Sequence, residues 1–200
     1  MLGIFLDSEA NGLNCKKHKL IEIAFRILDM ETGAEKDRFE SVIFQSFEDW
    51  QLSDLDSLQV NGFTWEDVSY GRARETIADE IIAMFAKHKI KRGEAVFICQ
   101  NPSFDRAFFA QLIDPDTQEK LLWPYHWLDL ASMYWAESMR KGKEGTSPYP
   151  WITGYSKDKI SKIYGIGPED KPHKAMNGVH HLIHCYEAVV GFPKKPLNNS

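Results

Sequence analysis

The order of the apolar segments is the feature that most limits what this chain can fold into. Three segments with β-strand character come first, at residues 4–6, 20–28 and 39–44, with no helical segment between them. Two further apolar strands, at 94–99 and 127–130, alternate with segments of helical spacing. Consecutive strands joined by turns pair antiparallel, whereas strands separated by helices pair in parallel. The order therefore predicts an α/β domain with a mixed sheet.

All the expected helices come after the third predicted strand. Within residues 72–89, apolar side chains recur at Ile77, Ile81 and Phe85, which is helical spacing. Gly, Ser and Pro within residues 141–150 favour a mobile loop. We expect one domain at residues 1–193 and a disordered tail at 194–200. The other expected helices cover residues 103–112, a segment after 127–130, 157–164, and about 173–190.

Composition narrows the class of protein. Apolar residues make up 43% and charged residues 26% of the 200 residues, which is typical of globular proteins. No stretch approaches the roughly 18 apolar residues of a membrane helix. The formal net charge of −5 argues against a protein that coats nucleic acid by bulk attraction. Three scattered cysteines and an N-terminus without a basic leader lead us to expect a cytoplasmic protein without membrane association.

The first candidate site is the acidic segment Asp7-Ser8-Glu9, at the end of the first strand. In an extended chain, positions i and i+2 face the same side, so Asp7 and Glu9 would share one face. Two such carboxylates repel each other unless a cation lies between them, and oxygen ligands suit Mg²⁺ or Mn²⁺. Taken alone, an acidic pair at a strand end is more often a solvated turn.

Two later segments carry further candidates. Asn101-Pro102-Ser103-Phe104-Asp105 follows an apolar strand and opens a helix, where Asp105 is either functional or a carboxylate favoured by the helix dipole. His173 stands near the start of the last helix and could act as a general base near neutral pH. A single histidine is more often structural, so each segment is ambiguous by itself.

Together, these segments resemble the DEDDh exonucleases, a group that includes the proofreading subunit of bacterial replicative polymerases, ribonuclease T and oligoribonuclease. The motif Asp-x-Glu is matched by residues 7–9, Asn-x-x-Phe-Asp by 101–105, and the beginning of His-x-Ala-x-x-Asp by 173–175. An Ile-Glu-Ile-Ala strand and an Asp-Leu pair also match, at 21–24 and 129–130. The resemblance covers residues 3–190. It implies a ribonuclease H-like fold, with a mixed five-stranded sheet flanked by helices.

The resemblance also implies an activity, namely a 3′→5′ exonuclease that hydrolyses single-stranded DNA or RNA ends to nucleoside 5′-monophosphates. Two divalent cations, Mg²⁺ or Mn²⁺, would hold the reacting phosphate. By resemblance, Asp7 would bridge both ions, Glu9 would bind the ion nearer the attacking water, and Asp105 would hold the second. His173 would deprotonate the water. Two cations about 3.5–4 Å apart can stabilise both the attacking and the leaving oxygen.

The substrate contacts implied by the resemblance surround the first two motifs. Residues Ala10, Asn11, Gly12 and Leu13 would receive the terminal nucleotide, with Leu13 wedged against the base. Asn101 and Phe104 would line the same site, although a phenylalanine at position 104 more often belongs to the core than to a base platform. The resemblance also implies that the chain could form a homodimer or associate with a polymerase.

The match fails at one position. The family's last Asp falls five residues after its His, and this chain has Gly178 there. Either the chemistry is retained, or the chain is a decayed relative that only binds nucleic acid or accompanies a polymerase. We predict that His181, one helical turn beyond Gly178, replaces the missing carboxylate as a metal ligand. A nitrogen ligand would favour Mn²⁺ or a later transition metal. A zinc site on His180 and His184 lacks further ligands.

Overall fold

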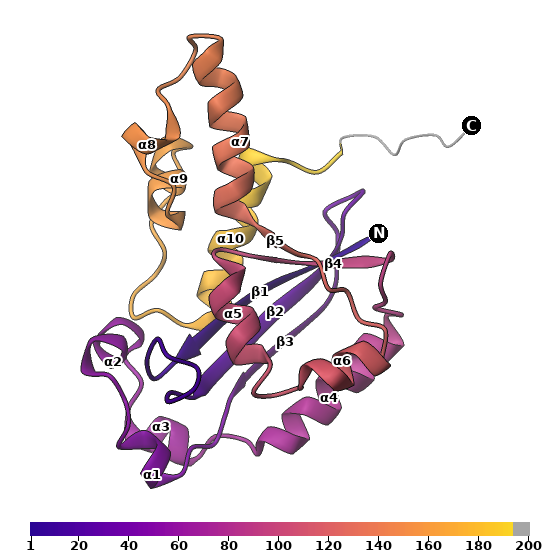
Figure 1. The fold of residues 1–200 in the computed structure, drawn as a ribbon, viewed down its shortest axis with the longest axis vertical. Helices are drawn as coiled ribbons and strands as arrows, with labels where there is room; N and C mark the ends of the chain where they lie inside the picture. The colour runs from indigo at the N-terminus through magenta and orange to yellow at the C-terminus, as the bar shows by residue number, and fades with distance from the viewer. Residues whose placement is uncertain (194–200) are drawn as a thin grey trace.

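The computed structural model describes residues 1–193, and the tail predicted at residues 194–200 lies outside the described residues. Five strands form one sheet in the order β3-β2-β1-β4-β5 (Figure 1). The first three pair antiparallel, whereas β4 is parallel to both β1 and β5. The predicted mixed sheet is thus confirmed. The strands are β1 (Leu2–Ala10), β2 (Leu20–Asp29), β3 (Glu35–Val42), β4 (Ala95–Cys99) and β5 (Trp127–Asp129).

Helices cover both faces of this sheet (Figure 1). No helix within residues 1–193 is long and apolar enough to cross a membrane. The helices are α1 (Phe47–Trp50), α2 (Leu55–Asn61), α3 (Trp65–Ser69), α4 (Arg74–Lys87), α5 (Pro102–Phe109), α6 (Pro115–Lys120), α7 (Leu130–Lys143), α8 (Pro150–Thr153), α9 (Lys157–Ile163) and α10 (Ala175–Val189).

The alternation of side chains along β1 divides the core into two parts. Ile4 and Leu6 face the layer of α4 and α5, where they pack in one cluster with Phe85 and other buried side chains. Phe5 faces the opposite layer and packs with residues of α7, α9 and α10, among them Val179. Since Asp7 continues the alternation of Phe5, the acidic end of β1 is directed towards α10.

Several boundaries differ from those expected from the sequence. The first strand continues through the acidic segment to Ala10, and α7 extends to Lys143, so the loop expected at 141–150 begins within a helix. His173 precedes α10 by two residues rather than opening it. Helices α1 to α3 were not predicted, because they are too short to show a helical period. Their N-caps, Ser46, Asp54 and Thr64, are their clearest sequence signals.

Candidate active site

Four of the predicted functional residues meet where β1 and β4 end. These neighbouring strands are parallel, so their carboxyl ends lie at the same edge of the sheet, where ligands bind in open α/β sheets. A hollow of about 300 Å³ opens there, and Asp7, Glu9, Asp105 and His173 all line it. A larger hollow of about 940 Å³ lies between α4 and residues 120–123, and none of these four residues lines it.

Asp7 and Glu9 come from alternate positions of β1. The Asp7 side chain is 16% exposed. Burial raises the pKa of Asp7 to about 6, although the nearby charge of Lys157 opposes the rise. Burial, followed by repulsion from Asp7, raises the pKa of Glu9 to about 8. Both carboxylates are thus held where their negative charge is costly without a counter-charge.

Asp105 lies in the first turn of α5 and is almost completely buried. Burial and the charge of Asp7 hold its pKa well above the usual range. Ser8, which points to the other face of β1 from Asp7, donates a hydrogen bond of 2.7 Å from Oγ to Asp105 Oδ1. The central residue of the first motif therefore fixes the carboxylate of the second.

The turn between β4 and α5 is formed by Asn101. Its φ of 58° is in the left-handed region, which Asn tolerates better than most residues. The Asn101 backbone N–H donates to Asp129 Oδ1 at 3.0 Å, and Asp129 also caps α7. Phe104, one helical turn on, is half-buried against Phe108 but still lines the hollow. It therefore belongs to both the core and the site, the two alternatives left open by the sequence.

Two contacts position His173, one through its own backbone N–H and one through its imidazole ring. Its N–H donates to the carbonyl of Val60, at 3.2 Å. Its imidazole Nδ1 lies 3.5 Å from Glu169 Oε1, and the side chain is 29% exposed. The adjoining helix is anchored by Glu22 of β2, whose Oε2 accepts the Ala175 N–H at 2.7 Å.

Lys157 and Glu169 complete the site, although the sequence motifs do not identify them. Lys157 Nζ lies 2.7 Å from Glu169 Oε2 and 3.6 Å from Asp7 Oδ1. Burial opposes ionisation of Glu169, but its contact with His181 and the charge of Lys157 lower its pKa to about 2. Burial likewise opposes the charge on Lys157, but Asp7 and Glu169 outweigh it and hold the Lys157 pKa above its usual value.

These two residues differ in how well the sequence could have pointed to them. Glu169 stands four residues before His173, so a search for carboxylates on the N-terminal side of the histidine would have found it. Lys157 has no such signal, because it is one of many lysines and its neighbours in the site are distant in sequence.

Gly178 lies directly beneath the carboxylate of Asp7. A Cβ atom at this position would be 2.0 Å from Asp7 Oδ2, much closer than atoms can approach. The space that a side chain at 178 would need is thus filled by Asp7. Gly178 allows Asp7 and α10 to approach each other, and even an alanine would displace the carboxylate.

His181 is buried and lies against Glu169, with 3.5 Å between its Nδ1 and Glu169 Oε2. The neighbouring Cys185 and Glu169 raise the pKa of His181 to about 9. A protonated imidazole cannot bind a metal ion. His181 lines a different hollow, which it shares with His180 and His184. Its role as a metal ligand stays a prediction, and it would require the imidazole to lose its proton.

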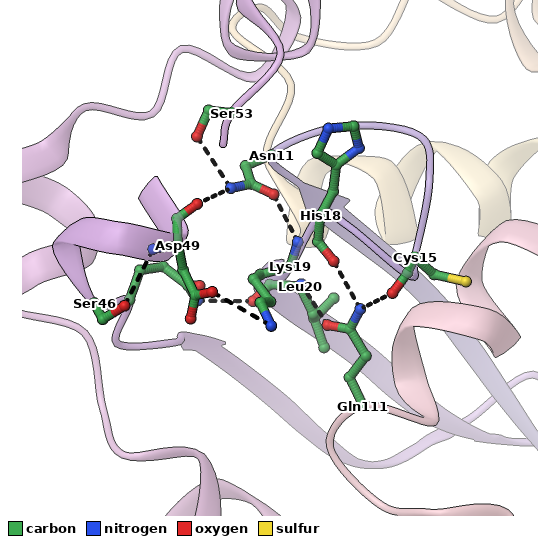
Figure 2. A network of polar contacts seen from close by, with 10 residues as sticks. Asn11, Cys15, His18, Lys19, Leu20, Ser46, Asp49, Ser53 and Gln111 are labelled. Atoms are coloured by element: carbon green, nitrogen blue, oxygen red, sulfur yellow. Dashed lines mark hydrogen bonds and ion pairs between the residues drawn. The ribbon is translucent and has the colours of Figure 1, made fainter. Parts of the chain in front are cut away.

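The loop after β1 combines fixed and exposed residues. Asn11 is fully buried, and its side chain bonds to the Asp49 carbonyl, the Ser53 hydroxyl and the Lys19 N–H (Figure 2). Its side chain therefore holds the loop instead of facing a ligand. A Cβ on Gly12 would collide with the His18 ring at 2.1 Å, so this close approach requires glycine.

Leu13, by contrast, is 76% exposed, as a residue that wedges against a base would be. It lines a second hollow of about 360 Å³ together with Ala10 and Gly12. Glu9 and Phe104 line this hollow as well as the first one. The hollow lined by the carboxylates is therefore continuous with a recess beside the loop. This recess is a candidate site for a nucleotide.

The residues of the site fit a divalent cation. The donors are carboxylate oxygens, the ligands that Mg²⁺ and Mn²⁺ prefer. Burial and mutual repulsion raise the pKa of Asp7, Glu9 and Asp105, and a cation would relieve both effects. Within residues 1–193, the structure shows no three His, Cys, Asp or Glu side chains already arranged to hold an ion. Asp7 and Glu9, on one face of one strand, are the residues best placed to hold it.

Comparison with known proteins gives one family. Residues 4–186 match the family model RNase_T, which is described as exonuclease. The match spans all three motifs and the strands that carry them. No curated protein matches the chain.

Solved structures with the same fold include several of exonuclease I. One, described as suggesting how processivity is achieved, gives a TM-score of 0.71 at 16% identity, covering 96% of this chain and 41% of that chain. E. coli exonuclease I with a dT13 oligonucleotide gives 0.68 at 15%, covering 94% and 40%. The zinc-bound form of its complex with single-stranded DNA gives 0.71 at 16%, covering 94% and 40%. The chain thus spans about two fifths of the exonuclease I chains.

Proposed function

The chain belongs to the RNase_T exonuclease family, and we propose that it is a divalent-metal-dependent 3′→5′ exonuclease that shortens single-stranded DNA or RNA and releases nucleoside 5′-monophosphates. The observation that carries this proposal is the meeting of Asp7, Glu9, Asp105 and His173 in one hollow at the end of β1. These residues come from three distant segments of the chain. Each segment alone has an ordinary structural explanation, but their convergence does not.

The residues of the site divide the chemistry between them. Asp7 and Glu9, with Asp105 behind them, would hold a divalent cation, which neutralises phosphate charge and makes water more acidic when bound. His173 accepts the proton of the attacking water as general base. Glu169, 3.5 Å from His173 Nδ1, holds the imidazole in orientation and stabilises its protonated form. A carboxylate that orients a histidine plays the same part in the Ser-His-Asp triad.

The recess beside the loop supports a strand end as the substrate. Leu13 presents an exposed apolar side chain at its rim, and Phe104 connects it to the carboxylates. We propose that the terminal nucleotide enters this recess, with its phosphate over Asp7 and Glu9. Asn101 lines the carboxylate hollow from the turn between β4 and α5. The complexes of E. coli exonuclease I with single-stranded oligonucleotides support this substrate class.

The first prediction tests the activity itself. A 5′-labelled single-stranded oligonucleotide is expected to give a ladder of shortened products with Mg²⁺ or Mn²⁺, and EDTA is expected to abolish the ladder. DNA and RNA of the same sequence should be compared, with nucleoside 5′-monophosphates identified by chromatography. If the chain binds the strand but shortens neither substrate with any divalent metal, a decayed binding module is the better interpretation.

The second prediction concerns His173. His173→Ala is expected to lower the rate constant by about 10²–10⁴-fold, the usual effect of losing a general base. Mn²⁺ affinity, measured by titration calorimetry, should change little. His184→Ala is the matched control, because His184 is exposed on α10 and does not line the carboxylate hollow. An equal loss of Mn²⁺ affinity in His173→Ala would identify His173 as a ligand instead of a base.

A further inference from the structure

Lys157 lies in a cradle of oxygen atoms that resembles a cation site. Its Nζ is 2.7 Å from Glu169 Oε2, 3.4 Å from the Gly178 carbonyl oxygen and 3.6 Å from Asp7 Oδ1. An ammonium group has three N–H donors, and three oxygen atoms surround this one. The Lys157 side chain is only 14% exposed, yet it lines the carboxylate hollow.

We propose that the Lys157 ammonium takes the place of a second divalent cation, so that the site binds one metal ion instead of two. This inference rests on the proposed function and refines it. The ion would be held by Asp7 and Glu9. Lys157 lines the same hollow, so its fixed charge would stabilise negative charge on the phosphate oxygens.

Gly178 and Glu169 fit this arrangement in complementary ways. Because nothing projects from Gly178, Asp7 can lie over α10, with its Oδ2 only 2.0 Å from the place where a Cβ of residue 178 would be. In this position its other oxygen, Oδ1, meets Lys157. Glu169 then supplies a carboxylate from the loop before His173, and this carboxylate pairs with an ammonium group instead of a metal ion. The absence of a side chain at position 178 and the ammonium group of Lys157 are thus parts of one arrangement around Asp7.

A purely structural ion pair is the competing explanation for Lys157. Such a pair would stabilise α9 against β1 and the loop before His173, and would leave the number of bound metal ions unchanged. The position of Lys157 argues for more than this, because its ammonium group touches Asp7, which is placed at the centre of the metal site. Lys159, on the same helix, is exposed and does not line the hollow, which makes it a matched control.

The test is the number of Mn²⁺ ions bound per chain, measured by titration calorimetry in the absence of nucleic acid. We expect one ion for the wild type and for Lys159→Ala. Lys157→Ala removes the ammonium group and opens its space, so a second ion is expected to bind between Asp7 and Glu169. Lys157→Met removes the charge but fills the space, and should still bind one ion. Two ions in the wild type, or one ion in Lys157→Ala, would overturn the inference.

Nuclease assays on the same variants give a second readout. Lys157→Met is expected to lose activity by at least about tenfold at every Mn²⁺ concentration, whereas Lys157→Ala should recover part of the loss as Mn²⁺ is raised. Unchanged activity in Lys157→Met would show an ion pair without a role in the reaction. Circular dichroism confirms folding, and Lys157→Ser, which also removes the ammonium group and opens its space, replaces Lys157→Ala if that variant unfolds. For Lys157→Ser, two bound ions with partial rescue of activity by Mn²⁺ support the inference, and one bound ion without rescue contradicts it.

The exonuclease activity and the role of Lys157 can be refuted separately. A wild-type chain that binds two ions and shortens oligonucleotides would retain the proposed function and refute only the role of Lys157. A chain that binds no divalent ion and leaves oligonucleotides intact would refute both.

Discussion

Asp7→Asn is expected to reduce metal-dependent hydrolysis by about 10³-fold or more, while the protein remains folded. The size follows from the several kcal/mol that a divalent ion contributes to phosphate chemistry, since each 1.36 kcal/mol is a tenfold change in rate. Asparagine has the same shape as aspartate, so the close approach to Gly178 is kept. The measurement is the single-turnover rate on a 5′-labelled oligonucleotide with Mg²⁺.

The control for this prediction is Asp158→Asn. Asp158 lines the same hollow, but its side chain is exposed at the start of α9. Removing its charge changes the electrostatic potential of the hollow without removing a buried ligand, so a change of less than about tenfold is expected. In EDTA, Asp7→Asn should melt at the wild-type temperature or above it, because the buried Asp7 carboxylate is no longer desolvated. Near wild-type rates in Asp7→Asn would refute the metal site assigned here.

The stability of the metal-free protein is expected to fall as the pH rises from about 5 to about 8. Burial raises the pKa of Glu9 from 4.5 to about 8, and that of Asp7 from 3.8 to about 6. Between these values, the folded protein binds protons that the unfolded chain does not bind. The free energy of unfolding therefore decreases with pH in this window. For a shift as large as that of Glu9, the full effect is at most several kcal/mol.

Other shifted groups leave the sign of this prediction unchanged. The pKa of His181, raised to about 9, also makes the folded state bind a proton that is lost as the pH rises, which acts in the same direction above pH 6.5. The lowered pKa of Glu169, about 2, contributes stability that is lost only as the pH falls below 4.5. The lowered pKa of His180 opposes the decline, but only below about pH 6.5. Burial also raises the pKa of Asp105, so the window reports on Glu9, Asp7 and Asp105 together.

Thermal melts in EDTA at several pH values measure this effect. Glu9→Gln is neutral at every pH, so it should melt above the wild type at pH 8 and should show a weaker dependence on pH. Glu66→Gln, an exposed position on α3, is the matched control and should follow the wild type. Mg²⁺ is expected to remove much of the wild-type decline, because metal ions bind the ionised carboxylates. A wild-type melting temperature that rises from pH 5 to 8 in EDTA would contradict this account.

Much of the fold could be read from the sequence because its signals are local. The strand of Leu20–Asp29 and the helix of Arg74–Lys87 are long enough to show their periods. The convergence of Asp7 and Asp105 follows from the rule that parallel strands present their carboxyl ends together. A resemblance to a known family supplied the expected pairing of these segments with His173, and all of these residues line the hollow.

The rest of the site depends on packing that no local pattern encodes. The approach of Asp7 to Gly178 is set by how α10 packs on β1, and the cradle around Lys157 exists only because α9, the loop before His173 and α10 meet there. From the sequence, Gly178 reads as a lost ligand. In the structure it is the reason that Asp7 can lie where it does.

The hydrogen bond from the Ala175 N–H to Glu22 also bears on how the site could tolerate change. It joins residues that are 153 positions apart in sequence. It fixes the position along the sheet at which α10 begins. His173 is two residues before this point and Gly178 three residues after it, so both take their position from β2. An insertion in an exposed loop between residues 30 and 170 could therefore lengthen the chain without moving the histidine relative to Asp7 and Glu9, so long as this contact and the hydrogen bond from the His173 N–H to the Val60 carbonyl are kept.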